Sequence, residues 1–210
     1  MAFIRTIPPS EAEGPVREMY QQAQSRFGYV PNWAQAFSLR PGVRDGWVAL
    51  LSSIQSNLPV RSYELATLAA ARALRSSYCA LAHGSVLADK VFDAATVVGI
   101  ATDAAESPLE PGERALMAFA EKVARSAEQI TSADIEVLRS HGYRDEEIFD
   151  LAAAAAARCF FSKLRSVTVV LFLLAHLANR NAVLATRRPK RAQSPLYGTR
   201  PRVADDCPAV

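Results

Sequence analysis

Arg61–Gly84, with the sequence RSYELATLAAARALRSSYCALAHG, contains two helices separated by a break. Its first part follows Pro59 and is rich in Ala and Leu as far as about Leu74, which is typical of a helix that begins just after a proline. Ser76 and Ser77 come next, and serine is a preferred N-cap residue. We therefore predict a helical hairpin whose second helix begins at these serines.

Helix signals also dominate the sequence before this hairpin. An amphipathic segment begins at Ser10, and its apolar face comprises Val16, Met19, Tyr20 and Ala23. A turn at residues 27–32 then leads into a second helix, because Pro31 restricts the residue before it and suits a first helical turn. Residues 42–56 repeat the helical period through Val43, Trp47, Leu50, Leu51 and Ile54.

The sequence after the hairpin has the same character. Pro111 marks a helix start, Thr131 with Asp134 forms a capping-box pattern, and Gly142 suits the residue just after a helix. Asp145 caps a last helix that runs into the alanine tract 152–157, whose small side chains allow helix backbones to approach closely. Strand signals are nearly absent before residue 165, so the predicted fold class is an all-α helical bundle.

The composition is that of a globular protein with one domain of ordinary size. The chain has 210 residues, of which 50% are hydrophobic and 21% are charged. Its three cysteines are an odd number and do not suggest a disulfide framework. No secretory signal is recognisable in the first residues. A reducing cytoplasm is therefore the expected location.

The charge is unevenly distributed along the chain. Residues 1–150 contain 14 Lys and Arg against 19 Asp and Glu, whereas residues 151–204 contain 10 Lys and Arg and no acid. The uncharged run 166–179 is shorter than the ~20 apolar residues of a membrane span. We predict a helical domain over residues 1–163 and an atypical tail over 164–210. The tail is expected to be apolar and then basic, partly disordered, without a membrane span or specific nucleic-acid binding.

Cys79 and His83 stand four residues apart in the second helix of the hairpin. If that helix begins at Ser76 or Ser77, Cys79 is in its first turn, where the helix dipole favours a thiolate. His83 is one turn further along the same face and can hold the thiol proton. The first helix, folded back, presents Glu64 as a carboxylate that orients the pair or relays its proton. These three are the predicted catalytic residues.

Each of them also has a purely structural interpretation. A free cysteine often fills space in a core, and Cys79 fits that description. His83 on its own would be an ordinary core histidine with satisfied hydrogen bonds. Glu64 suits the first turn of its helix as a solvated side chain, because the dipole favours an acid there. The residue pattern alone leaves these alternatives open.

The arrangement resembles the alkylhydroperoxidase D-like (AhpD-like) proteins of the carboxymuconolactone decarboxylase superfamily. They share a Glu, a Cys-x-x-Cys at a helix start and a His four residues after the second Cys, and Glu64, Cys79 and His83 match three of those positions. The stretches FGYVPNWAQAFSLRPGV (residues 27–43) and GYRDEEIFDLAAAAAARCFFSK (residues 142–163) are similar to the subgroup of peroxidase-related enzymes. The resemblance covers roughly residues 10–163 and implies an AhpD-like helical bundle.

Ser76 stands where this family has its first Cys, so the motif reads S-x-x-C. Serine can cap the helix or hydrogen-bond to the neighbouring sulfur, but it cannot form a disulfide. An oxidised Cys79 would need a second thiol from Cys159, Cys207, a partner subunit or a small molecule. We expect Ser76 and Tyr78, a residue of the pocket wall, to be the substrate-binding residues.

The function that the resemblance implies is that of a thiol-dependent, peroxidase-type oxidoreductase with a hydroperoxide substrate, a thiol reductant and no cofactor. Two alternatives stay open: a decarboxylase-like lyase with His83 as acid and base, and a non-catalytic redox-sensing helical module. A Cys-x3-His with one distant Glu does not supply the four ligands of a structural zinc site. The sequence also contains neither a glycine-rich phosphate loop nor a G-x-S-x-G motif.

The resemblance further implies a homo-oligomer, a trimer or a hexamer, with the pocket near a subunit interface. The sequence gives a separate reason, because the N-terminal part contains many large apolar side chains for a hairpin at the edge of a small bundle. These are Phe27, Tyr29, Trp33, Phe37 and Trp47. We expect part of that surface to need a partner.

Overall fold

The computed structural model describes residues 4–105 and 107–168, and these ranges contain helices and loops but no strand. The predicted all-α fold class is therefore confirmed for this part of the chain. In order, the elements are η1 (Pro9–Glu11), α1 (Gly14–Phe27), α2 (Asn32–Ala36), α3 (Pro41–Gln55), α4 (Val60–Ala73), α5 (Ser77–Lys90), α6 (Ala94–Thr102), α7 (Pro111–Ser126), η2 (Ala127–Gln129), α8 (Ser132–Ser140) and α9 (Asp145–Thr168).

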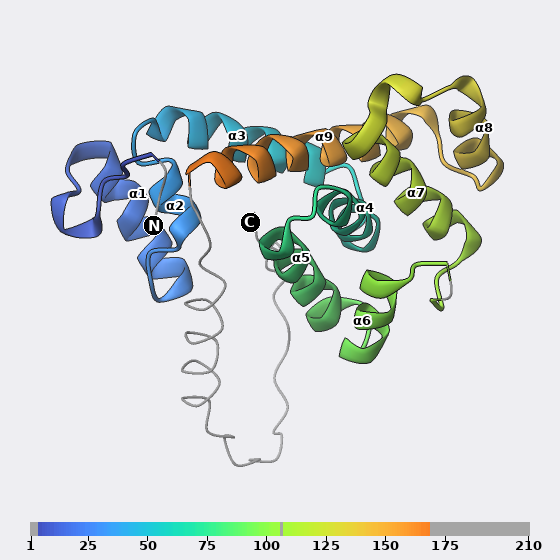
Figure 1. Ribbon diagram of the computed structural model, residues 1–210, viewed down its shortest axis with the longest axis horizontal. Helices are drawn as coiled ribbons and strands as arrows, with labels where there is room; N and C mark the ends of the chain where they lie inside the picture. Colours follow the sequence, from blue (N-terminus) through green and yellow to red (C-terminus); the bar gives the residue numbers. More distant parts are fainter. Residues whose placement is uncertain (1–3, 106, 169–210) are drawn as a thin grey trace, which may run out of the picture.

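Helix α4 lies at the centre of the bundle, where it packs against α5, α7 and α9. Figure 1 shows α9 running along the molecule, with α1 to α3 near its C-terminal half and α7 and α8 near its start. The facing helices are rich in buried alanine: Ala66, Ala69, Ala70 and Ala71 on α4, and Ala154, Ala155 and Ala157 on α9. Because these side chains are small, the backbones of α4 and α9 can approach closely.

The amphipathic patterns position the N-terminal helices. The predicted apolar face of α1 is buried, although the helix begins at Gly14 because residues 9–11 form a separate turn of 3₁₀ helix. In α3, the side chains of Trp47, Leu51 and Ile54 are buried as the helical period requires. Val43 and Leu50 are instead 45% and 50% exposed, so part of the outward face of α3 is apolar.

The turn between α4 and α5 is a Schellman motif with arginine in the position usually occupied by glycine. The amide of Ser76 donates to the carbonyl of Ala71 at 2.9 Å, and the amide of Arg75 donates to that of Arg72 at 2.9 Å. Arg75 has a φ of 54°, the left-handed conformation that the motif requires. Ser76 is the N-cap residue of α5, as predicted, but its side chain makes no capping hydrogen bond.

Three of the aromatic side chains that we expected near a subunit interface are buried in the chain's own core. Trp33, Phe37 and Trp47 are 7%, 3% and 5% exposed. Phe161 of α9 stacks on Trp47 with ring centroids 4.7 Å apart, and on Phe37 with centroids 6.3 Å apart. That argument for a partner surface is therefore wrong for these residues, because α9 covers Phe37 and Trp47 and Phe27 packs against Trp33.

Helix α9 continues past residue 163, the predicted domain boundary, as far as Thr168, the last residue that the structure describes. The rest of the predicted tail, residues 169–210 with Cys207, lies outside the described residues. Within the described ranges, no helix is both long and apolar enough to cross a membrane.

Candidate active site

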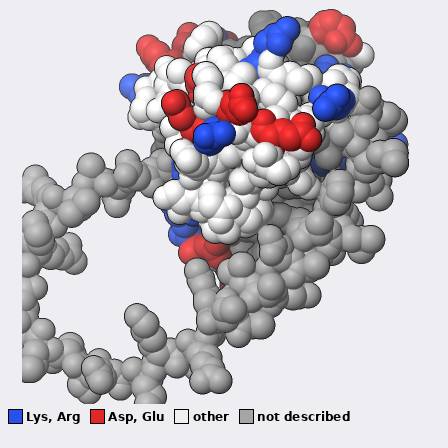
Figure 2. Space-filling model, turned by 90° about the vertical axis from the view of Figure 1, so that its left-hand side faces the viewer, with Lys and Arg blue, Asp and Glu red and all other residues white. Residues whose placement is uncertain are grey.

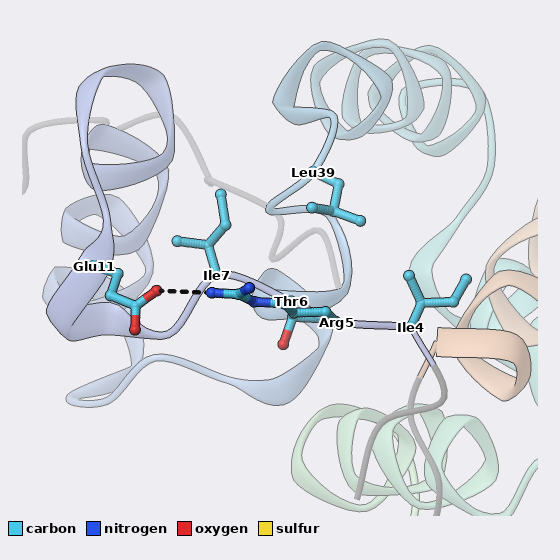
Figure 3. A pocket seen from close by; sticks show the side chains of 6 residues that line it. All are labelled: Ile4, Arg5, Thr6, Ile7, Glu11 and Leu39. Carbon is cyan, nitrogen blue, oxygen red and sulfur yellow. Dashed lines mark ion pairs between the residues drawn. The ribbon is translucent and has the colours of Figure 1, made fainter.

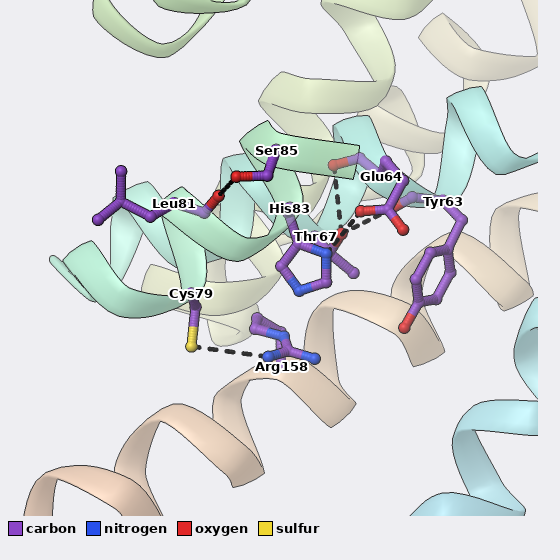
Figure 4. A network of polar contacts seen from close by, with 8 residues as sticks. All are labelled: Tyr63, Glu64, Thr67, Cys79, Leu81, His83, Ser85 and Arg158. Atoms are coloured by element: carbon purple, nitrogen blue, oxygen red, sulfur yellow. Dashed lines mark hydrogen bonds and ion pairs between the residues drawn. The ribbon is translucent and has the colours of Figure 1, made fainter. Parts of the chain in front are cut away.

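The three predicted catalytic residues come together in the interior of the molecule. Glu64 comes from α4, whereas Cys79 and His83 come from α5, and the three side chains are directed into the space between these helices and α9 (Figure 4). Glu64 is 4% exposed, Cys79 1% and His83 2%. The hairpin predicted from Arg61–Gly84 is thus the feature that brings the carboxylate to the thiol and the imidazole.

His83 and Glu64 form a buried hydrogen-bonded pair, with Nδ1 2.6 Å from Oε2. Burial lowers the pKa of His83, the charge of Arg158 lowers it further, and Glu64 opposes both effects without reversing them. The ring is therefore neutral near pH 7 and donates its Nδ1 proton to the carboxylate. Its Nε2 is left as a hydrogen-bond acceptor, and this buried atom has no hydrogen-bond partner among the described residues.

The sulfur of Cys79 lies against two polar side chains of α9. Its Sγ is 3.4 Å from Ser162 Oγ and 3.6 Å from Arg158 Nη1. Burial raises the pKa of this thiol, but the charge of Arg158 and hydrogen bonds from Ser162, Ser76 and Arg158 outweigh that effect. The pKa of Cys79 consequently lies below its ordinary value, which increases the fraction present as thiolate.

Arg158 and Ser162 contact the sulfur of Cys79, and the sequence analysis did not identify them. Both follow the buried stripe of α9, which also contains Leu151, Ala154, Ala155 and Phe161. An arginine at the helical spacing of such an apolar stripe indicates a buried charge that needs a partner, because a charged side chain is rarely fully buried without one. One of its partners, however, is a cysteine 79 residues away in sequence, and this contact between α5 and α9 is visible only in the structure.

The two predicted substrate-binding residues lie beside this sulfur in different ways. Ser76 is one of the groups that lower the pKa of Cys79, consistent with its expected contact with the thiol rather than with a capping role. Tyr78 is half-buried, and the guanidinium carbon of Arg165 lies 4.6 Å from the centre of its ring. Burial raises the pKa of Tyr78, so its hydroxyl is neutral. Their contact with a substrate stays a prediction.

Cys159 has different surroundings from Cys79. It is half-buried and lies on α9, with its Sγ 3.9 Å from the carbonyl oxygen of Ala124 on α7. Burial raises the pKa of this thiol. Cys159 therefore faces α7 with an unactivated thiol, and it is a suitable internal reference for the reactivity of Cys79.

A cavity of about 370 Å³ lies at the N-terminal end of the molecule (Figure 3). It is lined by Ile4, Arg5, Thr6, Ile7, Glu11 and Leu39. Its charged groups, Arg5 and Glu11, form a largely exposed ion pair at 3.7 Å. None of the predicted site residues lines it, so this cavity is not the candidate active site.

No protein-family model matches the chain, and no curated protein matches it in sequence. Solved structures match it in fold. A peroxidase-related protein from Ralstonia eutropha JMP134, described as an alkylhydroperoxidase AhpD core, is 24% identical with a TM-score of 0.70, covering 80% of this chain and 90% of its own. A peroxidase-related protein from Silicibacter sp. TM1040 is 23% identical with a TM-score of 0.67, covering 80% and 87%.

A third match is the debrominase Bmp8, solved as a cysteine-to-alanine variant in complex with 2,3,4-tribromopyrrole. It is 17% identical with a TM-score of 0.67, covering 85% of this chain and 95% of its own. These matches extend over most of the described helices and over nearly all of each matched structure. The chain therefore has the AhpD-like fold that the resemblance in its sequence implied.

Proposed function

We propose that this protein reduces hydroperoxides with Cys79 as the nucleophile, His83 as acid and base, and Glu64 as the group that orients His83. The observation that supports this most directly is the environment of the thiol. Cys79 is in the first turn of α5, its pKa is lowered by neighbours on α9, and a neutral imidazole with a free acceptor nitrogen lies one turn away. These are the conditions under which a cysteine acts as a nucleophile.

The chemistry requires one proton to be moved and returned. His83 Nε2 takes the thiol proton, and the thiolate attacks the terminal oxygen of the hydroperoxide. An S–O bond forms as the O–O bond breaks, which leaves a sulfenic acid on Cys79 and an alkoxide. The imidazolium then returns its proton to the alkoxide, so that thiol and hydroperoxide become sulfenic acid and alcohol.

The sulfur is restored by a thiol from outside the motif, because Ser76 cannot supply one. That thiol attacks the sulfenyl sulfur, forms a mixed disulfide with Cys79 and releases water. A second thiol then displaces Cys79 as a thiol and leaves as the oxidised reductant. This makes a small-molecule thiol the proposed reductant.

Peroxide consumption by the purified full chain, with dithiothreitol as reductant, tests the assignment. Cys79→Ser should abolish turnover, and His83→Gln should lower it by about 10²- to 10⁴-fold because a general acid-base group is lost. Cys159→Ser is the matched control and should retain full activity, since this thiol lies against α7. Unchanged turnover in Cys79→Ser, in a variant with native circular dichroism and unfolding temperature, would refute the proposal.

The same variants separate the lyase alternative from the peroxidase. A decarboxylase that uses His83 would lose activity in His83→Gln and keep it in Cys79→Ser, whereas the peroxidase loses activity in both. Because the fold is also that of Bmp8, an assay with 2,3,4-tribromopyrrole and dithiothreitol belongs beside the peroxide assay. Release of bromide that depends on Cys79, without peroxide consumption, would replace the peroxidase assignment by thiol-dependent debromination.

A further inference from the structure

Arg158 is a positive charge in the middle of the protein core. It is 1% exposed and lies in the apolar stripe of α9. Burial of a guanidinium is costly unless nearby groups compensate for it. Within the described core, this charge lies in contact with the one cysteine that is fully buried, Cys79.

The geometry directs Arg158 at the sulfur. Its Nη1 is 3.6 Å from Cys79 Sγ, and its guanidinium carbon is 5.1 Å from the ring centre of Phe161. Ser162, one turn further along α9, approaches the same sulfur to 3.4 Å. Figure 4 shows the guanidinium beside the thiol and below the imidazole of His83. One face of α9 thus supplies a cation and a hydroxyl to a single sulfur atom.

We propose that Arg158 is a catalytic residue that holds Cys79 as a thiolate before the reaction and, after it, holds the oxidised sulfur as a sulfenate anion. The first half of this proposal concerns the resting protein and is independent of the substrate. The second half rests on the proposed peroxidase function. This role does not follow from the sequence resemblance. It follows from the contacts that Cys79 on α5 makes with Arg158 and Ser162 on α9.

The charge of Arg158 also affects which groups of the site are ionised. A positive group beside both Cys79 and His83 stabilises an anionic sulfur and disfavours an imidazolium, and the lowered pKa values of both groups agree with this. Arg158 therefore increases the fraction of Cys79 that is present as thiolate, and it makes an imidazolium on His83 a stronger acid that passes its proton on to the alkoxide. The sulfenic acid formed by oxidation can give its proton to His83 Nε2 or to water, and the resulting sulfenate oxygen is an acceptor for the Arg158 N–H groups and the Ser162 hydroxyl.

The ionisation of Cys79 takes place among several other titratable or charged groups. Those of the helices packed around it are Tyr63 and Glu64 on α4, Tyr78 and His83 on α5, and Arg158 and Arg165 on α9, with Tyr29 from the loop after α1 beside Tyr78. Arg158 is the cation among these that acts on Cys79, His83, Tyr63 and Tyr78 together. A change at Arg158 should consequently alter the pH profile of the thiol more than a change at any other cation.

The test measures how the rate of Cys79 alkylation by iodoacetamide depends on pH, read by mass spectrometry of the peptide that contains it. Arg158→Met keeps an unbranched apolar stem in place of the aliphatic part of the arginine and removes the charge. It should raise the thiol pKa and slow labelling at pH 7 by about tenfold for each unit by which that pKa rises above 7. At pH 10, where the thiol ionises without help, the rate should return to within about threefold of the wild type. Arg158→Lys should fall between the two.

Two controls separate this role from a structural one. Arg125→Met removes an exposed arginine of α7 and should leave the pH profile of Cys79 unchanged. Cys159 provides a second thiol in each sample, and Arg158→Met should change its labelling much less than that of Cys79, because burial and Lys163 act on the pKa of Cys159 more strongly than Arg158 does. If the substitution only loosened the packing of the protein, iodoacetamide would label Cys79 faster than in the wild type at every pH. Equal pH profiles for wild type and Arg158→Met, in proteins with matched circular dichroism spectra, would overturn the thiolate half of the proposal.

The sulfenate half is tested after one equivalent of hydrogen peroxide, by trapping with dimedone. Wild type should hold the sulfenate, and Arg158→Met should lose it to further oxidation or to thiol at least about tenfold faster. Equal lifetimes would overturn this half. If wild type shows an arginine-dependent thiol pKa yet consumes no peroxide, the proposed function fails and the role of Arg158 in the thiolate stands.

Discussion

Position 76 lies three residues before Cys79, at the N-cap of α5 and among the groups that lower the pKa of this thiol. Ser76→Cys would create the Cys-x-x-Cys of the resembling family. We expect the variant to form a reversible disulfide with Cys79 under mild oxidant, and to turn over hydroperoxide faster with dithiothreitol because resolution becomes intramolecular. Thiol counting and mass spectrometry of the oxidised protein provide the measurement.

Ser77→Cys is the matched control for this experiment. Residue 77 is exposed and two positions from Cys79, and side chains at that spacing on a helix do not face each other. Its thiol should therefore stay free under the same oxidant. A disulfide in both variants, or in neither, would contradict the geometry of the α5 start.

At the scale of single residues, the sequence was sufficient where the relevant geometry is local. The spacing of Cys79 and His83 follows from one helical turn, and Glu64 needs only the hairpin formed by two adjacent helices. Arg158 and Ser162 depend on where a helix about 80 residues later crosses α5, which no local pattern specifies. The one signal available in the sequence was a charged residue, Arg158, at the helical spacing of the buried stripe of α9.

At the scale of the elements, the α4–α5 turn contains a residue that is conformationally disfavoured. Arg75 adopts a left-handed φ of 54°, which costs a non-glycine residue free energy that the Schellman hydrogen bonds offset. Arg75→Gly should increase the free energy of unfolding by about 0.5–1 kcal/mol, after the added entropy of the unfolded chain is allowed for. Arg75→Val should decrease it by about 1 kcal/mol or more, because a β-branched residue is poorly accommodated there.

The end of α8 provides the comparison for this prediction. Gly142 occupies the equivalent place in a Schellman motif, with a φ of 90° and its amide bonded to the carbonyl of Arg139 at 2.9 Å. Gly142→Ala should therefore destabilise the protein by about 1 kcal/mol. Urea denaturation of the three variants measures these differences, and a loss of stability in Arg75→Gly would show that the arginine side chain contributes more than its backbone costs.

The elements themselves were predictable because their boundary signals are chemical and local. The Thr131–Asp134 capping box and the Gly142 helix end are present as expected. The burial of Trp47 was misjudged, since it depends on Phe161 of α9 covering that ring. Helix boundaries can be read from neighbouring residues, whereas the choice between core and interface depends on the whole arrangement of helices.

At the scale of the whole molecule, the predicted homo-oligomer now has a different candidate interface. Val43, Gly46 and Leu50 follow one outward stripe of α3 at helical spacing, and the two large side chains are 45% and 50% exposed. The end of the molecule seen in Figure 2 has charges of both signs above an uncharged area.

Sedimentation velocity of the full chain at micromolar concentration tests the oligomer. We expect a trimer or hexamer, and we expect Leu50→Glu to weaken it by at least about tenfold in Kd, because a carboxylate would be buried against a partner. Phe149→Glu is the control, since this side chain is 71% exposed on α9 and does not belong to the outward stripe of α3. A wild-type monomer at these concentrations would end the prediction, and an unaffected Leu50→Glu oligomer would exclude α3 as its interface.

The central position of α4 determines how substitutions far from the site reduce the activity of the protein. Glu64 belongs to the helix that packs against α5, α6, α7 and α9, so it has no low-energy local opening of the kind found at frayed ends and surface loops. The number of functional active sites then equals the number of folded molecules. A remote substitution that costs about 1.4 kcal/mol multiplies the unfolded population about tenfold. It leaves the turnover of each folded molecule unchanged, so damage far from the thiol lowers abundance and not catalysis.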